Sequence, residues 1–476
     1  MKATQFIKLI ILIFYTIACA NKNPAETSGD NTKDTTVVSN AETQDSFDVG
    51  KVIHHVICKT DAAQSYALYI PVKGNKEALP IIYFFDPHVD GSLPLNKYKA
   101  LADAYDFILI GSNNSKNGND WSITENIWHT LFDDTQKRLK INSNRIYTCG
   151  FSGGAKVASY VALHNNNIKS VIAGGAGLPD GTPAGNFNFS FTAIAGEGDM
   201  NMTDLVATNN ELDKTQTRHR IIFFEGKHEW APESTMNIAF ASLQLDGIHE
   251  KLISKDDEFI NDYITKSKKR FNEYYTTNKL IKAEQECKLS ISMLDGLSNE
   301  VNWFKQKDAS LTNNTAYQKQ WQAQQNLFNI EQNMKAVYMQ QFQNGDINYW
   351  TKTISDLRTK VNAQTAEGAM CQRLLAYLSL AFYSFSNQLI NSNQNNGAQY
   401  FVELYKMSDP TNSEAWYFSA ILDARNNNAK ATEDDLSKAV EYGFADKNRL
   451  EQQAEFQNMT TQINFSQIES KMKKIE

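Results

Sequence analysis

YTCGFSGGAKVASYVAL, residues 147–163, places a serine at a tight bend between an apolar run and a helical pattern. Gly150 and Gly154 lie two residues before and after Ser152, and residues 153–164 have apolar side chains at helical spacing. Glycine at both positions permits a sharp turn in which larger side chains would collide. The strand–turn–helix pattern predicts that Ser152 Oγ projects above the carboxyl end of a strand. Ser152 is then either a nucleophile or simply the residue that fits the turn.

Residues 50–249 alternate short apolar runs with helical stretches, which predicts an α/β domain. Several runs are continuous β-branched or aromatic stretches, as is typical of parallel strands buried on both faces. We expect helices over 96–105, 127–141 and 153–164, with right-handed crossovers between the strands. The prediction is a doubly wound, mostly parallel sheet of about eight strands. The predicted strands are 52–58, 66–72, 81–85, 107–111, 145–149, 170–175, 191–196 and 220–226.

Two short motifs add a resemblance to a known family. GFSGG, residues 150–154, resembles the nucleophile elbow of the α/β hydrolases, and GKHEW, residues 226–230, is similar to the histidine motif near the end of that fold. Without a large inserted lid, the region resembles the branch that contains polyhydroxybutyrate depolymerases and feruloyl esterases, although Lys227 replaces a second glycine. The resemblance covers residues 50–232 and implies a serine hydrolase that needs no cofactor.

The resemblance also implies a chain order of nucleophile, acid and histidine. Downstream of Ser152, His164 ends the helix that follows the serine, and His219 precedes a predicted strand. His228 instead follows the apolar run IIFFEG, at the carboxyl end of a strand, where the loops of an open α/β sheet contact ligands. We therefore expect His228 to be the general base; the alternative is a structural histidine.

The acid is expected after the preceding strand, in FTAIAGEGDMN. Asp199 lies beyond the two-glycine bend of this segment, as the acid does in the α/β hydrolases, with Glu197 and Asp204 as alternatives. A carboxylate at this place would accept a hydrogen bond from His228 Nδ1–H and stabilise the imidazolium. The competing interpretation is that Asp199 caps a helix that begins at MTDL.

An oxyanion hole needs two N–H donors near the serine. The first is expected to be Gly153 N–H, at the start of the helix. The second is expected from FFDPHVDG, the loop after the third strand. Since Pro87 has no N–H, this donor is predicted to be His88 or Val89.

Two further loop patterns are weaker signals. SNNSKNG, residues 112–118, follows the fourth strand at the same edge, so Asn113, Asn114 and Ser115 either contact substrate or form a capped turn. One loop contains Asp86, His88 and Asp90. These side chains are of different ligand types and do not form a metal-binding pattern. We therefore expect neither a metal nor a cofactor.

Residues 250–476 contain a single proline, Pro410, and few glycines, which favours an all-α region. Pairs such as Phe382 and Trp416 recur 34 residues apart, the period of the tetratricopeptide repeat. Residues 413–443 resemble such a repeat, and this resemblance implies a concave surface that binds a protein partner or shields the active site. The expected packing positions of the repeat are Trp416, Ala420, Leu436 and Ala439.

The first 19 residues combine lysines, a short apolar core and a cysteine end, the features of a secretion signal. The small residues before Cys19 resemble the lipobox of bacterial lipoproteins, with Thr16 in place of the usual leucine. This resemblance implies cleavage before Cys19 and lipid on its sulfur, hence a cell-envelope protein anchored to a bacterial membrane. The alternative is an ordinary signal with an incidental cysteine. Residues 20–49 are polar and aperiodic, which predicts a disordered tether.

The composition is that of a globular protein that does not bind nucleic acid. The chain has 476 residues, a formal net charge of −7 and 41% hydrophobic residues. The motifs favour a membrane-anchored serine hydrolase that cleaves small-molecule or oligomeric carboxylic esters through an acyl-enzyme. The alternatives are a peptidase or acyltransferase of the same fold, and a catalytically silent surface lipoprotein whose helical repeats bind a protein partner.

Overall fold

The computed structural model describes residues 46–74, 76–362 and 364–472. The predicted signal peptide, Cys19 and most of the predicted tether lie outside the described residues. None of the helices in these ranges is long and apolar enough to cross a lipid bilayer.

Eight strands form one sheet in the order β1-β2-β4-β3-β5-β6-β7-β8. β2 is antiparallel to both of its neighbours, and all other pairs are parallel. The strands are β1 (Val52–Ile57), β2 (Ser65–Tyr69), β3 (Leu79–Phe85), β4 (Ile108–Ser112), β5 (Ile141–Phe151), β6 (Ile168–Gly174), β7 (Ser190–Gly196) and β8 (His219–Phe224). Each predicted strand overlaps an observed one, so the predicted fold class of a mostly parallel α/β sheet is confirmed.

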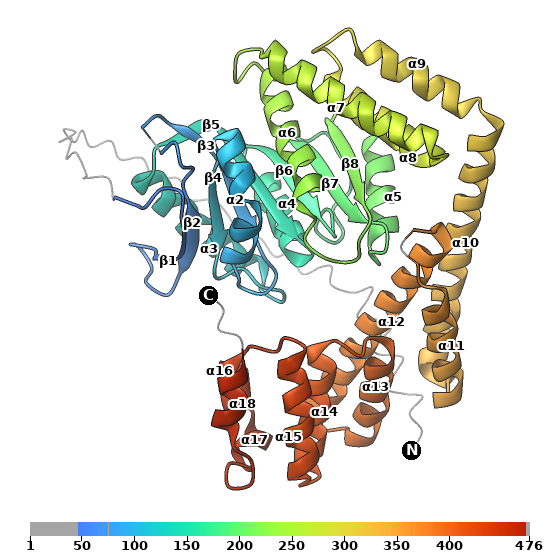
Figure 1. The fold of residues 1–476 in the computed structure, drawn as a ribbon. Coiled ribbons are helices and arrows are strands. Elements are labelled where there is room, and N and C mark those ends of the chain that lie inside the picture. Colours follow the sequence, from blue (N-terminus) through green and yellow to red (C-terminus); the bar gives the residue numbers. More distant parts are fainter. Residues whose placement is uncertain (1–45, 75, 363, 473–476) are drawn as a thin grey trace, which may run out of the picture.

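Five helices flank the sheet, and they form the α/β half together with the eight strands (Figure 1). α2 and α6 pack on one face, whereas α3, α4 and α5 pack on the other. The helices are α2 (Ser92–Tyr105), α3 (Trp121–Arg138), α4 (Gly153–His164), α5 (Met202–Leu212) and α6 (Glu233–His249). α3 ends three residues before the predicted boundary at 141 because Leu139 adopts an extended backbone that leads into β5.

The rest of the described chain is helical, as predicted, and is called here the helical half. Its helices are α7 (Asp257–Thr276), α8 (Leu280–Leu294), α9 (Val301–Thr312), α10 (Thr315–Asn344), α11 (Ile347–Lys360), α12 (Ala366–Asn391), α13 (Asn395–Ser408), α14 (Ser413–Arg425), α15 (Ala429–Glu441), α16 (Lys447–Gln452), α17 (Ala454–Gln457) and α18 (Phe465–Lys471). Figure 1 shows α10 running along one side of the molecule, from the level of the sheet to the C-terminal helices.

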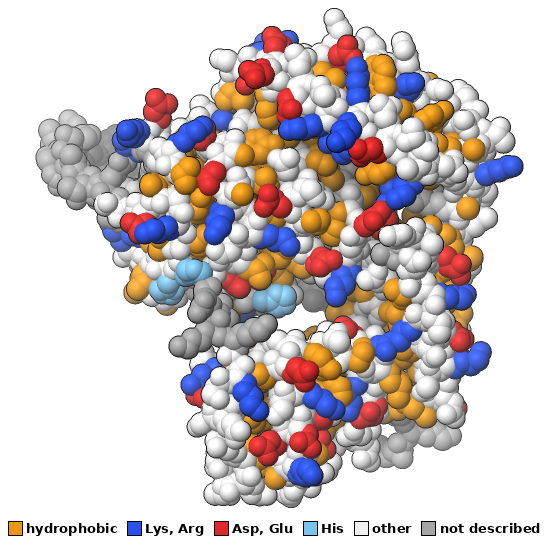
Figure 2. All heavy atoms as spheres, viewed as in Figure 1, with side chains coloured by type: hydrophobic (Ala, Val, Ile, Leu, Met, Phe, Trp, Pro, Cys, Tyr) orange, Lys and Arg blue, Asp and Glu red, His pale blue; other side chains and the backbone are white. Residues whose placement is uncertain are grey.

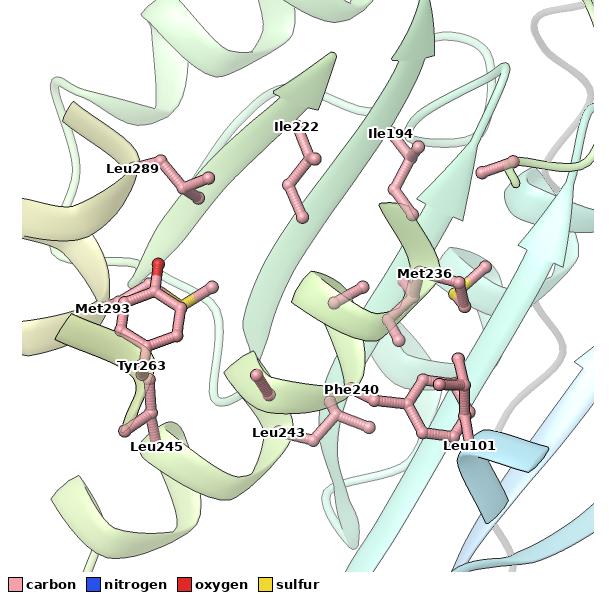
Figure 3. Packing of buried hydrophobic residues seen from close by; sticks show 14 of the residues in the cluster. Leu101, Ile194, Ile222, Met236, Phe240, Leu243, Leu245, Tyr263, Leu289 and Met293 are labelled. Atoms are coloured by element: carbon pink, nitrogen blue, oxygen red, sulfur yellow. The ribbon is translucent and has the colours of Figure 1, made fainter. Parts of the chain in front are cut away.

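The apolar core of the sheet continues into the helical half. Ile194 of β7 and Ile222 of β8 belong to the same buried cluster as Phe240 of α6 and Met293 of α8. Figure 3 shows these side chains, together with Tyr263 of α7, in one layer between the strands and the helices. Burial of apolar surface across residue 250 therefore couples the first helices of the helical half to the sheet.

The segment that resembles a tetratricopeptide repeat forms a helix pair, α14 and α15. Three of its predicted packing residues, Ala420, Leu436 and Ala439, are fully buried in the core of the C-terminal helices. The fourth, Trp416, is half-buried; its indole N–H donates to Pro410 O (2.8 Å), and Lys438 Nζ lies 4.0 Å from the ring centroid.

Candidate active site

Ser152 lies at the turn between β5 and α4 with φ 53° and ψ −123°, a strained conformation for a residue with a side chain. A Cβ atom on Gly150 would lie 2.0 Å from Gly154 O, and one on Gly154 would lie 1.9 Å from Phe85 O. Backbone contacts therefore exclude any other residue at both positions, for the steric reason inferred from the sequence.

His228 links Ser152 to Asp199. His228 Nε2 is 2.9 Å from Ser152 Oγ, and His228 Nδ1 is 2.9 Å and 3.0 Å from the two carboxylate oxygens of Asp199. The three residues come from the turns after β5, β7 and β8, which meet because the carboxyl ends of parallel strands share one edge of the sheet. The structure thus brings together the three residues that the sequence singled out.

The backbone around Asp199 fixes its carboxylate. The side chain is 1% exposed, and Asp199 Oδ1 accepts a hydrogen bond from Asn201 N–H (2.8 Å). The two alternative acids point elsewhere: Glu197 pairs with Lys282 on α8, and Asp204 lies at the exposed surface of α5. Asp199 does not cap α5, since the residue before that helix is Asn201.

The other two histidines considered as bases lie outside this arrangement. His164 Nδ1 is 2.8 Å from Tyr160 O, on its own helix. His219 Nε2 is 3.1 Å from Asp213 Oδ1, at the opposite end of β8 from His228. This second His–Asp contact provides a matched control for experiments on His228 and Asp199.

The oxyanion donors expected from the loop after β3 are occupied in the structure. His88 N–H donates to Asp86 Oδ1 (2.8 Å), and Val89 N–H donates to Ser115 O (3.2 Å). Neither N–H is free to meet an oxyanion, because an aspartate two residues earlier competes for the first and the neighbouring loop accepts the second. Gly153 N–H, by contrast, has no hydrogen-bond partner among the described residues.

Asn117 was not singled out from the sequence, yet its side chain lies against Gly153. A Cβ atom on Gly153 would be 1.8 Å from Asn117 Oδ1. Asn117 is exposed, and its side-chain amide forms no hydrogen bond within the described part of the chain. The available signal was its place in the polar loop after the fourth strand, but the sequence did not distinguish it from the other asparagines.

Those other residues form the capped turn that was the alternative interpretation. Asn113 Nδ2 donates to His54 O (3.0 Å), and Asn114 Oδ1 accepts from Ser65 N–H (2.9 Å). Ser115 N–H donates to Ser112 Oγ (3.2 Å). The two asparagine side chains tie the loop to β1 and β2.

Aromatic residues pack behind the histidine. The ring centroids of Phe151 and His228 are 4.7 Å apart, and those of Phe151 and Trp230 are 5.6 Å apart. Trp230 Nε1–H donates to Asp86 Oδ2 (2.8 Å), so the Asp86 carboxylate has a structural role. Gly175 has φ +64°, and a Cβ atom on it would lie 3.0 Å from His228 Cε1, which explains why a glycine follows β6.

The rim of the site faces the helical half. Asp86 raises the pKa of the exposed His88 imidazole, and Glu414 at the start of α14 also contributes to this rise. Figure 2 shows histidine side chains along the edge of the α/β half that is turned toward the C-terminal helices. A cavity of about 450 Å³ lies between α5 and the segment 176–184, and both Lys156 and Asn201 line it.

Within the described ranges, no group of three or more His, Cys, Asp or Glu side chains is arranged to hold a metal ion. The four cysteines of these ranges are buried and unpaired. The groups that meet at this edge of the sheet are a serine, an imidazole and a carboxylate, with Gly153 N–H next to the serine, and together they suit acyl transfer.

Comparisons with known proteins give a limited result. No protein-family model matches the chain, and no curated protein matches it by sequence. An esterase from Pyrobaculum calidifontis is similar in structure with 11% identity and a TM-score of 0.34, over 43% of this chain and 87% of that one. A fungal esterase from Rhizomucor miehei has 13% identity and a TM-score of 0.33, over 41% and 84%. A putative dienelactone hydrolase from Klebsiella pneumoniae has 16% identity and a TM-score of 0.27, over 35% and 81%.

These similarities concern the fold alone. The strand order, the antiparallel second strand and the strand–serine–helix turn after β5 are found in the chain itself. The α/β half of this protein therefore has the α/β-hydrolase fold, followed by a helical region.

Proposed function

We propose that the chain is a serine hydrolase that cleaves carboxylic esters. The observation that carries this proposal is the continuous contact from Ser152 Oγ through His228 to the buried Asp199 carboxylate. A strained, partly buried serine with an imidazole at 2.9 Å is the arrangement that activates a hydroxyl for attack on a carbonyl.

In the proposed mechanism, Ser152 Oγ attacks the ester carbonyl while His228 Nε2 takes the hydroxyl proton. His228 then gives this proton to the leaving alcohol, and an acyl group remains on Ser152. A water molecule activated by His228 releases the acid and restores the serine. Asp199 orients the imidazole and stabilises its charged form throughout.

The oxyanion is proposed to bind Gly153 N–H and the side-chain amide of Asn117. Within the described part of the chain, Gly153 N–H has no hydrogen-bond partner at the start of α4, where the helix dipole favours negative charge. Asn117 is the amide that lies against Gly153, whereas the N–H groups of His88 and Val89 are already bonded. Rotation of the Asn117 amide by 180° about its terminal bond would exchange its oxygen and nitrogen, which presents Nδ2–H beside Gly153.

A fluorophosphonate probe tests the proposal without knowledge of the substrate. We expect a single adduct on Ser152, located by peptide mass mapping at pH 8. His228→Ala should slow labelling at least about 100-fold, because general-base assistance contributes this much or more.

His219→Ala is the matched control, since it breaks the other His–Asp contact and should leave labelling unchanged. A folded wild-type protein that acquires no adduct would refute the proposed function. If the protein is labelled, turnover of p-nitrophenyl esters without turnover of p-nitroanilides supports an esterase over a peptidase.

Asn117→Ala is expected to lower kcat about 100-fold with little change in KM, because an oxyanion donor acts in the transition state and not on the bound ester. Asn114→Ala is the matched control in the same loop, since its amide bonds to Ser65 and Ala63 instead. An unchanged kcat in Asn117→Ala would exclude this amide from the oxyanion hole.

The cellular setting is proposed from residues outside the described ranges. We propose that lipid on Cys19 anchors the protein to a bacterial membrane, on the periplasmic or surface face, and that residues 20–49 act as the tether. The domain limits at 50–249 and 250–476, and a protein partner for the tetratricopeptide-like helices, remain proposals from the sequence as well.

A further inference from the structure

We propose that Lys282 and Arg373, two cations of the helical half, hold the loops that carry Asp199 and His228 in their catalytic positions. The inference rests on the proposed function, because it assigns these residues a positioning role in that same site. It makes the helical half a working part of the active site in addition to any role in binding a partner.

Lys282 on α8 bridges the two loops with one ammonium group. Its Nζ lies 2.8 Å from Glu197 Oε1 and 2.8 Å from Glu225 Oε1. Glu197 is two residues before Asp199, and Glu225 is three residues before His228. The hydrogen bond from Lys282 lowers the pKa of the Glu225 carboxyl, so Glu225 meets the ammonium as a carboxylate at neutral pH.

The bridge differs from an ordinary surface ion pair, which contributes little because water competes for both charges. The side chains of Lys282 and Glu197 are 23% and 24% exposed, and a single ammonium serves two carboxylates from different loops. A compact ammonium with three donors on a flexible stem suits this geometry. The effect of the bridge is on geometry: it fixes one loop relative to the other.

Arg373 on α12 contacts the loop that carries Asp199, called here the acid loop, from a second direction. Its Nη1 donates to Glu197 O (2.6 Å), and its Nε and Nη2 donate to Glu331 Oε2 on α10 (2.9 Å and 2.6 Å). Arg373 is 3% exposed and Glu331 is fully buried, so the guanidinium is held in place before it reaches the loop. A planar guanidinium with fixed donor directions then restricts the orientation of the Glu197 carbonyl.

The next residue along the loop is also enclosed by the helical half. A Cβ atom on Gly198 would lie 2.6 Å from Gln372 Oε1, so α12 packs directly on the peptide that precedes Asp199. Backbone bonds from Glu197 N to Phe224 O and from Gly198 N to Gly226 O join the two loops as far as Gly198. Lys282 and Arg373 add contacts to Glu197 from outside the sheet.

A cavity of about 540 Å³ lies on the outer side of this bridge, between β8, α5 and helices α8, α10 and α12. Lys282, Arg373 and Glu197 line it. Beside the cavity, Phe328 of α10 packs against the core of the sheet. Lys282 and Arg373 connect the acid loop itself to α8 and α12.

The test compares three variants of the full-length chain: Lys282→Met, Lys282→Arg and Lys305→Met. Lys305 is the matched control, since its Nζ pairs with Asp295 Oδ1 (2.9 Å) inside the helical half. The readouts are the rate constant and saturation constant for fluorophosphonate labelling, and the low-field proton resonance of His228 Nδ1–H. We expect Lys282→Met to be labelled about 10-fold more slowly at an unchanged saturation constant, because a loop displaced by a fraction of an ångström misaligns the reacting atoms.

In Lys282→Met the Nδ1–H resonance should broaden through faster exchange with water, whereas Lys282→Arg and Lys305→Met should retain it. A folded Lys282→Met protein with the labelling rate and resonance of wild type would overturn the inference. If wild type is not labelled at all, the proposed function fails, and the resonance alone decides whether the bridge positions His228 and Asp199. If Lys282→Met does not fold, Glu225→Gln replaces it in the test. This variant keeps the Lys282–Glu197 pair, so we expect a smaller loss of labelling rate than in Lys282→Met, and a wild-type rate and resonance would overturn the inference.

Discussion

The Ser152→Ala variant is expected to lose about 10⁶-fold in kcat on any ester that the wild-type protein cleaves. No other side chain can supply the acyl-accepting oxygen at this turn, because Gly150, Gly153 and Gly154 surround it. Residual activity should come only from binding the ester beside the oxyanion donors, with water as the nucleophile.

The measurement is steady-state hydrolysis together with intact mass after mixing with substrate. Wild type should gain the mass of an acyl group, and Ser152→Ala should not. Unfolding by urea serves as the control for stability, since alanine fits the turn at least as well as serine. An alanine variant that turns over at the wild-type rate would place the reaction at a different residue.

The Asp199→Asn variant is expected to lose about 10⁴-fold in kcat with a small change in KM. Asparagine keeps an oxygen for Asn201 N–H, but its amide nitrogen then faces His228 Nδ1. An imidazole that accepts a hydrogen bond at Nδ1 carries its proton on Nε2 and cannot take the proton of Ser152. The loss should therefore lie in the chemical step and not in binding.

Asp213→Asn is the matched control for this prediction. It removes the carboxylate from the contact with His219, which has a similar length but lies at the other end of β8. Its kcat should stay within a factor of about two of wild type, since surface ion pairs contribute little. Equal losses in the two variants would mean that Asp199 acts through stability and has no special role in catalysis.

The fold and the three central residues were predictable from local sequence signals. The glycines at positions 150 and 154 indicate close backbone contacts around Ser152, and these contacts force the turn. His228 and Asp199 could be chosen because both follow strands, and parallel strands deliver such residues to one edge. In each case the deciding information lies within a few residues of the site.

The rest depends on contacts between distant segments, which no local pattern encodes. The N–H groups of His88 and Val89 were plausible donors until Asp86 and Ser115 were seen to accept from them. Lys282 is 83 residues from Asp199 in the sequence, and it lies in a helix with an ordinary polar surface. Only the packing of α8 against the sheet shows that the Lys282 ammonium reaches the loops that carry Asp199 and His228.

The helix α10 fixes the rotation of the C-terminal helices relative to the core that the sheet shares with α6, α7 and α8. Its 30 residues span about 45 Å; Tyr317 near one end belongs to the core of the sheet, while Tyr338 and Phe342 near the other belong to the core of the C-terminal helices. Insertion of one residue between these ends would turn one core against the other by about 100° and lengthen the helix by about 1.5 Å. The phase of this helix thus determines whether Glu331 meets Arg373, the residue that contacts the acid loop, so the two cores at its ends fix the length of α10.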